Sequence, residues 1–550
     1  AELGSAVLGP NCMGVAVPGG ASMYIGTVTG DVRPGHVAVI AQSGSIADGL
    51  LALGPRVGFR AVVSSGGEMV TDAADFLAFF AADEQTRAVG VFLETVRRPE
   101  AFAAALALCA EAEKPVVCLK VGRSQAAGRV ALAHTGALVG SRRAFSALLR
   151  AYGALEVDDF PLFVETLEVL GCRRRPRGPR AAAVSESGGE AGLLADVAED
   201  AGLPLPEFSA ELAGRLTTAF PLFLSPTNPL DAWAIDAPEK VYPGSFSLLA
   251  ASGDFDMLLA QVDLSRFRGE GDQTWCETIV RALADAVVGT DLFGAVVTTH
   301  TTDPPAWATA LAAERDLALL RGPGVACRAL AAVAAWRPHP PGRPPVSPVP
   351  IDDLARPGAL SERDSTTLFR RYGLPFAEAL AAATPEEAGR AASALGGTVV
   401  VKADGPAHKA KAGGVVTGVE GAAAAAAAAS RIGGPVLVAR QLEPLSGTPE
   451  IVVGVTRDPQ FGPVVIVGRG GVEVERLDRV EACLAPVEAT MALELLRAAG
   501  LPEDDRLAAF LVALGRLASE HPGVVEAETN PVLLTADGPV AVDALVVFAP

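Results

Sequence analysis

Residues 36–48 read His36-Val-Ala-Val-Ile-Ala-Gln-Ser-Gly-Ser-Ile-Ala-Asp48. A short apolar run is followed by a Ser-Gly-Ser turn and then by a helical pattern, so the stretch predicts strand, tight turn and helix. Ala181-Ala-Ala-Val184, followed by Ser185-Glu-Ser-Gly-Gly189, repeats this arrangement. The repeat predicts two related α/β domains, each with a parallel sheet and crossover helices.

Strand-like and helical runs alternate along the chain after this stretch. Ala88 to Leu93 and Pro115 to Val121 have the composition of buried strands, and helical patterns separate them. This alternation is typical of flavodoxin-like, doubly wound domains, whose ligands lie beyond the carboxyl ends of the strands. The turns at residues 43–45 and 187–189 therefore lie where a ligand is expected.

The pattern divides the chain into five segments. Residues 1–31 are too few for a domain, and residues 32–174 and 178–336 are the two repeated α/β domains. Residues 337–358 are rich in proline and are expected to form a semi-rigid linker. Residues 359–550 begin with a helical pattern, continue with strand-like runs and contain an alanine run, 422–429, that predicts a helix because alanine is the strongest helix former.

Composition excludes several classes of protein. A chain of 550 residues with 50% hydrophobic residues can bury the cores of several domains. The net charge of −19 opposes binding to nucleic acid, whose phosphates require a basic surface. No apolar run reaches the ~20 residues that cross a bilayer, so no association with a membrane is expected.

Cysteine usage and the first residues indicate a cellular compartment. The seven cysteines include no Cys-x-x-Cys pair, which disfavours a metal held by cysteine and favours reduced thiols. The first residues lack a basic region followed by an apolar core, and so do not resemble a secretory signal. Both observations predict a cytoplasmic protein.

His134 is the strongest candidate for a catalytic residue. It lies in the run Val130-Ala-Leu-Ala-His-Thr-Gly-Ala-Leu-Val-Gly-Ser141, between a predicted strand and a predicted helix that carries Phe145, Leu148 and Leu149 on one face. A helix N-terminus offers unpaired N–H groups and a positive dipole end, which favour a phosphate group. The alternative is a loop histidine that hydrogen-bonds to backbone.

Several motifs occur in one order along the chain. They are Gly9-Pro-Asn-Cys-Met-Gly14, Gln42-Ser-Gly-Ser45, Lys120-Val-Gly-Arg-Ser124, Ala133-His-Thr-Gly-Ala-Leu138, Ser187-Gly-Gly189, Asn228-Pro-Leu-Asp231, His408-Lys409 and Gly413-Gly-Val415. Together they resemble the ADP-forming (NDP-forming) acyl-CoA synthetases, which are relatives of succinyl-CoA synthetase. The resemblance implies two succinyl-CoA synthetase-like flavodoxin domains followed by a C-terminal ATP-grasp domain.

The resemblance also implies a reaction. Acyl-CoA, ADP and phosphate are interconverted with carboxylic acid, CoA and ATP through an acyl phosphate and a phosphohistidine. The implied cofactors are ATP or ADP, CoA and Mg²⁺, and the implied partners are a small carboxylic acid and either a second copy of the chain or a separate CoA-binding subunit.

The resemblance assigns residues to the acyl and phosphate end of the reaction. His134 matches the phosphorylated histidine, and Glu94 matches a carboxylate that orients it by holding one ring nitrogen protonated. Phosphate-binding turns are expected at Ser43, Gly44, Ser45, Gly136, Ser187, Gly188 and Gly189. The alternatives are a strand-end carboxylate that binds a backbone amide, and glycines that serve only tight turns.

At the nucleotide end, the resemblance assigns Lys402 and Glu450 to nucleotide binding. Asn530 and Asp543 match magnesium ligands, since Mg²⁺ needs few protein oxygens when it also takes phosphate oxygens and water. His408 matches a second histidine that carries phosphate towards ADP in some members, and a structural role is the alternative.

Three departures from the family pattern keep other functions open. Lys411 stands where the family usually has aspartate, and Gly67 where it commonly has asparagine. The N-terminal Rossmann domain that binds CoA is largely missing, and residues 1–31 match only a remnant of it. This is expected if the chain is a fragment, if another subunit supplies the domain, or if CoA binding is lost. The alternative function is therefore a catalytically degenerate regulatory or ligand-sensing module of a larger protein, such as a protein lysine acetyltransferase.

Overall fold

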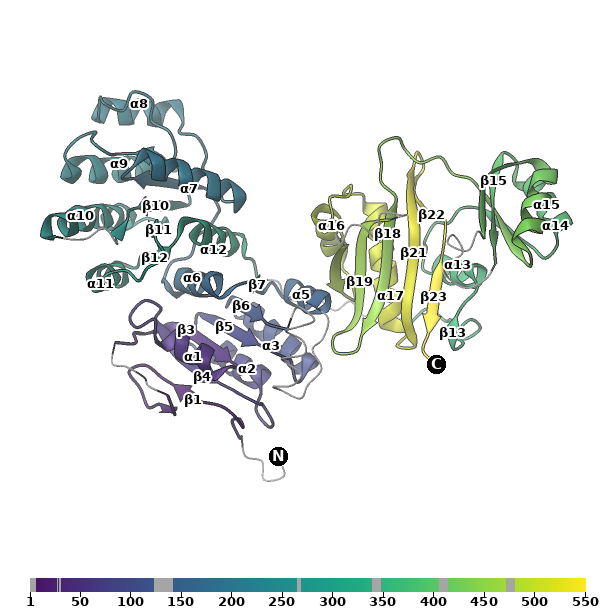
Figure 1. Cartoon of the computed structure of the whole chain (residues 1–550), viewed down its shortest axis with the longest axis horizontal. Coiled ribbons are helices and arrows are strands. Elements are labelled where there is room, and N and C mark those ends of the chain that lie inside the picture. Colours follow the sequence, from purple (N-terminus) through teal and green to yellow (C-terminus); the bar gives the residue numbers. More distant parts are fainter. Residues whose placement is uncertain are drawn as a thin grey trace. The chain divides into compact units, whose positions relative to one another are not determined.

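The chain folds as two units in the computed structural model (Figure 1). The structure describes residues 6–26, 28, 31–122, 142–264, 269–338, 348–404, 414–470 and 480–550. The first unit comprises Ala1–Val139 and Tyr152–Pro341, and the second comprises Gly140–Ala151 and Gly342–Pro550.

A seven-stranded sheet in the order β2-β1-β4-β3-β5-β6-β7 forms the first half of the first unit. Its strands are β1 (Gly14–Ala16), β2 (Met23–Tyr24), β3 (Pro34–Ala41), β4 (Phe59–Ser64), β5 (Ala88–Leu93), β6 (Val116–Lys120) and β7 (Leu155–Val157). Helices α1 (Gly44–Leu51), α2 (Ala73–Ala82), α3 (Pro99–Glu111) and α6 (Phe160–Gly171) connect or follow them. The parallel order β4-β3-β5-β6-β7 is the flavodoxin-like order.

A five-stranded parallel sheet in the order β12-β11-β10-β8-β9 forms the second half. Its strands are β8 (Ala181–Ser185), β9 (Leu230–Asp231), β10 (Met257–Gln261), β11 (Phe293–Thr298) and β12 (Ala318–Arg321). Its helices are α7 (Gly188–Asp200), α8 (Ala210–Ala219), α9 (Pro238–Ser252), α10 (Glu270–Val287), α11 (Ala306–Arg315) and α12 (Pro323–Ala335). Numbered along the chain, this order is the same as in the first sheet, so the predicted pair of flavodoxin-like domains is confirmed.

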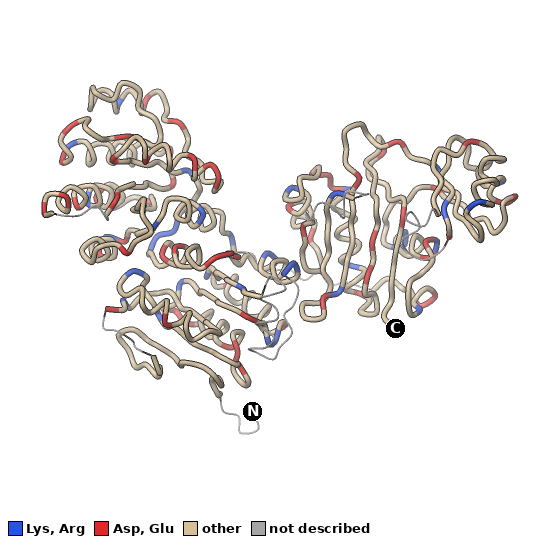
Figure 2. The backbone as a smooth tube through the Cα atoms, in the orientation of Figure 1, with Lys and Arg blue, Asp and Glu red and all other residues tan. Residues whose placement is uncertain are grey.

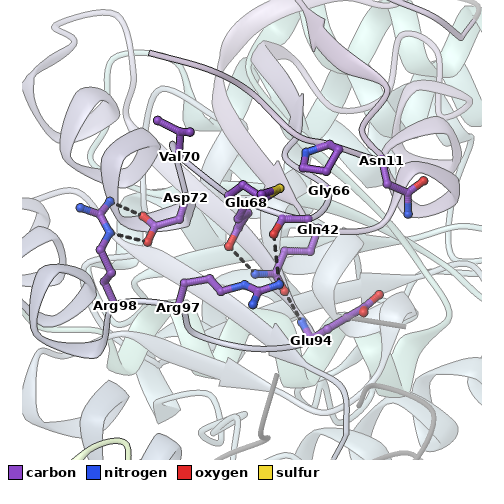
Figure 3. Close-up of a pocket in the computed structure, with 12 residues that line it drawn as sticks. Asn11, Gln42, Gly66, Glu68, Val70, Asp72, Glu94, Arg97 and Arg98 are labelled. Atoms are coloured by element: carbon purple, nitrogen blue, oxygen red, sulfur yellow. Dashed lines mark hydrogen bonds and ion pairs between the residues drawn. The ribbon is translucent and has the colours of Figure 1, made fainter. Parts of the chain in front are cut away.

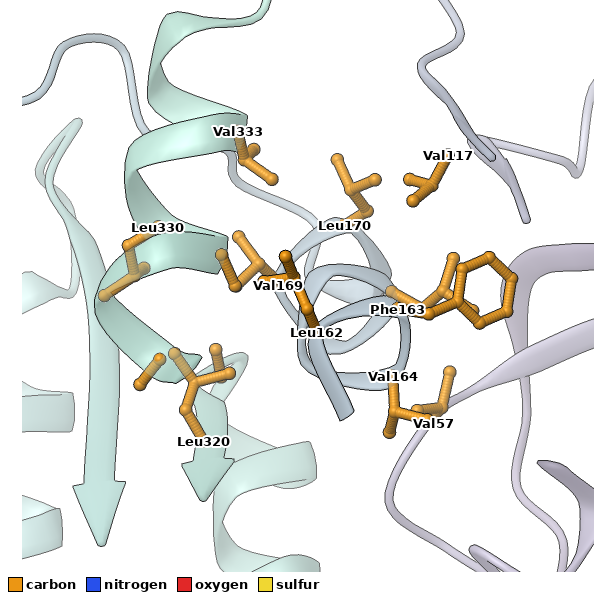
Figure 4. Close-up of a cluster of buried hydrophobic side chains, with 14 of the residues drawn as sticks. Val57, Val117, Leu162, Phe163, Val164, Val169, Leu170, Leu320, Leu330 and Val333 are labelled. Carbon is orange, nitrogen blue, oxygen red and sulfur yellow. The ribbon is translucent and has the colours of Figure 1, made fainter. Parts of the chain in front are cut away.

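Helix α6 joins the two halves into one unit (Figure 4). Every residue from Leu162 to Leu170 is buried, because one side of the helix packs against the first sheet and the other against α12. Gly90 on β5 allows helix α6 to approach the sheet closely, since a Cβ at this position would lie 2.9 Å from Cζ of Phe163. Burying a side chain such as Phe163 stabilises the fold by roughly 1.5–3 kcal/mol.

A buried ion network crosses the same interface. Glu165 of α6 pairs with Arg56 of the first domain at 2.5 Å and with Arg321 of the second at 3.1 Å. Because a buried carboxylate is costly unless it is paired, these contacts fix the relative positions of the two domains within the unit.

The second unit contains two antiparallel sheets. The larger has the order β13-β23-β21-β18-β19-β20, with β22 paired to β21, and the smaller has the order β14-β17-β15-β16. The larger contains β13 (Gly358–Ala359), β18 (Ile451–Asp458), β19 (Gly462–Arg469), β20 (Val480–Leu484), β21 (Val524–Thr535), β22 (Gly538–Ala541) and β23 (Leu545–Phe548). The smaller contains β14 (Ala379–Ala382), β15 (Thr398–Ala403), β16 (Val415–Glu420) and β17 (Val436–Arg440).

Helices cover both sheets of this unit. They are α13 (Glu362–Arg371), α14 (Pro385–Leu395), α15 (Gly421–Ile432), α16 (Ala489–Ala498) and α17 (Asp505–Glu520). The predicted alanine helix is α15, and its small side chains pack with α14 against the smaller sheet. The predicted helical start followed by strands is therefore confirmed.

Two findings differ from the segments drawn from sequence. Strand β1 lies in the segment predicted to stand apart, yet it pairs with β4 and adds an antiparallel edge to the first sheet. Helix α5 (Arg142–Ala151) lies between β6 and β7 in the chain but belongs to the second unit.

The contacts of α5 explain its placement. Ala144 and Ala147 pack in a small cluster with Val464 and Ala482 of the second unit. The rings of Phe145 and Phe461 lie 6.1 Å apart, and Arg150 pairs with Glu481 at 2.9 Å. The helix therefore buries its apolar face on β19 and β20.

Acidic residues are not confined to one part of the described chain. Figure 2 shows acidic residues spread over both units, as the net charge of −19 requires. Within the described part of the chain, no helix combines the length and apolar character needed to span a membrane.

Candidate functional site

A cavity of about 590 Å³ opens at the carboxyl ends of the strands of the first sheet (Figure 3). Gln42 follows β3 and Glu94 follows β5, and both line it together with the loop after β4. Strand β3 lies between β4 and β5 in the sheet. The chain passes from β3 to β4 on one side and then crosses to β5 on the other side. The cavity therefore lies at the topological switch point, where ligands of doubly wound sheets bind.

The side chain of Gln42 holds the backbone beside Glu94. Its Oε1 accepts hydrogen bonds from the N–H groups of Glu94 (2.6 Å) and Thr95 (3.0 Å). Its Nε2 donates to the carbonyl oxygen of Thr95 (2.8 Å) and to Oε2 of Glu68 (2.7 Å). Because Gln42 is only 5% exposed, these bonds form out of water and fix where the Glu94 side chain begins.

Glu68 is a second carboxyl group in the cavity wall. It is 5% exposed and accepts hydrogen bonds from Gln42 and from the hydroxyl of Ser65 (2.7 Å). Burial raises the pKa of Glu68 to about 7 despite these hydrogen bonds, and the nearby charge of Asp72 adds to the rise. Its φ of 51° is in the left-handed region, which is costly for a residue with a side chain and is often found at functional sites.

Two arginines bring positive charge to the same wall. Arg98 makes two hydrogen bonds of 2.7 Å to the carboxylate of Asp72 and one of 2.6 Å to Asp75. Arg97 donates to the carbonyl oxygen of Gly67 at 3.0 Å. This wall therefore combines cations and carboxyl groups, a mixture suited to binding an anion and handling a proton.

The two predicted phosphate-binding turns are helix N-termini in the structure. Ser43 caps α1 and Ser187 caps α7, and neither side chain makes the usual capping hydrogen bond. First-turn N–H groups have no partner within their own helix, which makes such an end favourable for phosphate. Binding of phosphate at residues 43–45 and 187–189 stays a prediction.

Three predicted site residues cannot be placed against this cavity. His134, Gly136 and His408 lie outside the described residues, as does Lys411. Their roles therefore stay predictions from the sequence.

The second unit has a small pocket of about 80 Å³ between its two sheets, lined by both charged and apolar side chains. Lys402 of β15 is 6% exposed, pairs with Glu362 of α13 and donates to the carbonyl oxygen of Val542. These three residues line the pocket together with residues of β14 and β17. Binding of nucleotide phosphates by Lys402 stays a prediction.

The predicted magnesium ligands lie next to this pocket. Val532 of β21 pairs with Ala541 of β22, and the N–H of Val542 donates to the carbonyl oxygen of Pro531, so the register places Asn530 opposite Asp543. Within the described residues, no group of three or more His, Cys, Asp or Glu side chains forms a metal site. One amide and one carboxylate oxygen still suit Mg²⁺, which takes its other ligands from phosphate and water.

Glu450 is placed differently from the other predicted nucleotide residues. It precedes β18, its side chain is exposed, and its carbonyl oxygen accepts a hydrogen bond from Gly470 at 2.6 Å. It is not among the described residues that line the pocket around Lys402.

Comparison with known proteins adds independent evidence. Residues 34–170 match the succinyl-CoA ligase-like flavodoxin domain, and residues 355–548 match the ATP-grasp domain. A trans-feruloyl-CoA synthase from an unknown prokaryotic organism is 30% identical over 99% of this chain and 81% of the relative. An ADP-forming acetate–CoA ligase of Archaeoglobus fulgidus is 28% identical over 98% of this chain and 82% of the relative.

The chain belongs to the ADP-forming acyl-CoA ligase family.

A solved structure agrees with this family in fold. The acetyl-coenzyme A synthetase 1 of Ca. Korarchaeum cryptofilum, in complex with phosphate and ADP, has a TM-score of 0.52 and 24% sequence identity. The match covers 60% of this chain and 71% of that chain. Together with the two domain matches, this likeness in fold confirms the predicted combination of flavodoxin-like and ATP-grasp domains.

The structure adds site residues that were not assigned from sequence. Gln42 was part of a quoted motif without a role, and Glu68 and Glu362 were not singled out. The position of Gln42 directly after a buried strand was a usable signal, because strand ends meet at the switch point. Glu68 and Glu362 carry no such signal, since Gln42 and Lys402, which they meet, are distant from them in the chain.

Proposed function

We propose that this chain catalyses the ADP-forming acyl-CoA ligase reaction through His134. Phosphate attacks acyl-CoA, which forms an acyl phosphate and breaks the bond to CoA. His134 then takes the phosphoryl group and releases the carboxylate, and ADP takes it from His134 to form ATP. The observation that carries this proposal is the cavity at the switch point, where Gln42 holds the backbone of Glu94.

The cavity residues suit the acyl and phosphate half of this reaction. A carboxylate at Glu94 can accept a hydrogen bond from the protonated ring nitrogen of His134, which keeps the proton on that nitrogen and leaves the other nitrogen free to attack phosphorus. The N–H groups at the start of α1 favour the phosphoryl oxygens. We propose that residues 187–189 and Gly136 also bind phosphoryl oxygens.

The pocket of the second unit suits the nucleotide half. Lys402 would neutralise phosphate charge, and Asn530 and Asp543 would hold Mg²⁺, which supplies charge neutralisation on the phosphates when bound. We retain Glu450 as a nucleotide-binding residue and His408 as a relay of phosphate, both on the family resemblance.

We propose that the acid is larger than acetate. Cavities of roughly 300–1,000 Å³ enclose drug-sized ligands, and the cavity of about 590 Å³ lies in this range. The relative named trans-feruloyl-CoA synthase supports an aromatic acid. Assays of CoA-thioester formation with acetate, 4-hydroxybutyrate and ferulate test this, and a preference for acetate would contradict it.

We place the protein in the cytoplasm, with a second copy or a CoA-binding subunit as partner. The seven cysteines all lie in the described residues and form no disulfide, which suits a reducing compartment. Gel filtration with light scattering tests the second copy, and co-purification tests the separate subunit.

Labelling of the protein tests the phosphohistidine. Incubation with acyl-CoA and labelled phosphate in the absence of ADP should leave acid-labile label on the protein, and His134→Ala should abolish it, because from this side His408 receives phosphate only through His134. His300→Ala is a matched control, because this histidine is 59% exposed in the second flavodoxin-like domain. Full labelling of His134→Ala would overturn the proposal.

A further inference from the structure

Glu68 is held in the cavity wall by a hydrogen bond to each of its two carboxyl oxygens. Its two oxygens accept hydrogen bonds from different elements, Oε1 from Ser65 in the same loop and Oε2 from Gln42 at the end of β3. Its backbone adopts the left-handed conformation at φ 51°. Strain of this kind persists only where surrounding contacts maintain it.

The contact with Gln42 completes the hydrogen bonding of an amide side chain. Both N–H groups of Nε2 have acceptors, one on Glu68 and one on Thr95, and Oε1 accepts two backbone N–H groups. Removing the acceptor on Glu68 would leave one N–H of a buried amide unsatisfied. The amide could then rotate and release the backbone at Glu94.

The charges around Glu68 come from two neighbouring elements. Asp72 caps α2, and its charge is balanced by the two hydrogen bonds from Arg98. Glu94 and Arg97 follow β5 and line the same cavity. A phosphate entering this cavity meets a carboxyl group at Glu68 that can lose its charge near neutral pH.

We propose that Glu68 is a positioning residue that fixes the Gln42 amide, and through it Glu94, while its proton uptake accommodates the anionic substrate. The proposal rests on the function proposed above for Glu94 and His134. A protonated carboxyl still accepts from Gln42 through its carbonyl oxygen and donates to Ser65, so the support of Gln42 is kept when the charge is lost. Ionised Glu68 repels phosphate, and protonated Glu68 does not.

The sign of the pH effect follows from this arrangement. Below about pH 7 Glu68 is mostly protonated, and above it a negative charge faces the phosphate. The KM for phosphate should therefore rise with pH across neutrality in the natural protein. In Glu68→Gln, which keeps an acceptor for Gln42 and a donor for Ser65 without the charge, this rise should be smaller.

The experiment measures ATP formation from acyl-CoA, ADP and phosphate by the complete protein between pH 6 and pH 8.5. Phosphate itself titrates in this range, but it does so equally for every variant, so the difference between proteins isolates Glu68. Glu68→Gln should keep kcat within about threefold, and Glu68→Ala should lower kcat by about tenfold, the loss expected for one orienting hydrogen bond. Glu84→Gln changes an exposed carboxylate of the same domain and serves as the control.

The outcomes separate this proposal from the proposed function. If Glu94→Gln and His134→Ala lose activity while Glu68→Ala keeps kcat and Glu68→Gln keeps the pH dependence of the natural protein, the role of Glu68 is overturned and the function stands. If Glu94→Gln and His134→Ala remain active, the function itself fails. Circular dichroism and thermal unfolding establish folding, and the isosteric Gln variant keeps the test decisive if Glu68→Ala does not fold.

Discussion

The two flavodoxin-like domains share one strand order but differ at the carboxyl ends of their strands. In the first, Gln42 and Glu94 line a cavity of about 590 Å³ at the switch point between β3 and β5. In the second, the corresponding residue after β8 is Glu186, which is 4% exposed. Its carboxylate accepts hydrogen bonds from the N–H of Asp263 (2.9 Å) and from the indole N–H of Trp275 (3.1 Å).

The helix N-termini at these switch points differ as well. The first turn of α1 carries no acidic residue. The first turn of α7 carries Glu190, and a Cβ at Gly188 would lie 2.8 Å from the carboxylate of Asp231. Topology therefore decides where a site can form, and the side chains decide how open and how positive that place is.

Helix α6 is shared by the two domains, so a change there should affect both. Glu165→Ala leaves Arg56 buried without its carboxylate partner, and removing one member of a buried pair costs about 3–5 kcal/mol of unfolding free energy. Urea denaturation followed by circular dichroism measures the loss. Arg328→Ala, whose ion pairs with Asp158 and Asp159 are partly exposed, is the control expected to lose far less.

One change at each of the two switch points should separate catalysis from packing. Glu94→Gln should lower kcat about 100-fold, the upper end of the usual contribution of a carboxylate that orients a histidine. Glu186→Gln should leave kcat within about threefold and instead cost about 1–3 kcal/mol of stability, because a buried acceptor of two hydrogen bonds is altered. Steady-state kinetics and urea denaturation of both variants measure these effects, and equal loss of kcat in the two would refute the comparison.

The cavity wall at Gly67 should influence the choice of acid. A Cβ there would lie 3.2 Å from the carbonyl oxygen of Pro10, and both residues line the cavity. The methyl group added by Gly67→Ala is therefore expected to narrow the cavity. We expect kcat/KM for ferulate to fall about tenfold more than that for acetate, the cost of roughly one misplaced methyl-sized group. Gly192→Ala on α7 meets no atom within 4 Å and should change neither value.

The smallest effect is expected at α5. The corresponding crossover helix of the second domain, α11, packs within its own domain, whereas α5 belongs to the other unit. Arg150 and Glu481 are partly exposed, so a double-mutant cycle of Arg150→Ala and Glu481→Ala should give a coupling of about 0.2–1 kcal/mol. Zero coupling at low salt would show that α5 is held on β19 and β20 by its apolar face alone.

Local sequence patterns predicted most of the fold. The apolar runs at β3, β5 and β8 and the alanine helix α15 each satisfy their own period and propensity, so no distant contact is needed to recognise them. The turns before α1 and α7 were predicted for the same reason. The boundaries proposed for the domains stay predictions, and β1 and α5 show how pairing and packing moved elements across them.

The candidate site was predicted only where a residue directly follows a strand or matches a family motif. Glu94 and Lys402 were recognised in this way. Gln42 with Glu68, and Lys402 with Glu362, are pairs separated by 26 and 40 residues, and no local pattern specifies which carboxyl group each polar side chain meets. Such pairs form because burial removes water and each polar group then needs a protein partner.

The sequence by itself determined that two doubly wound domains and a third, mixed domain follow one another, since apolar periodicity and glycine turns act within a few residues. It also supplied the motifs that place the chain in its family. Only the tertiary structure decided that Gln42 and Glu94 line a cavity at one switch point, and that Glu186 accepts a hydrogen bond from Trp275 at the other. That choice depends on side-chain volume and hydrogen bonding between residues far apart in the chain, which local patterns do not encode.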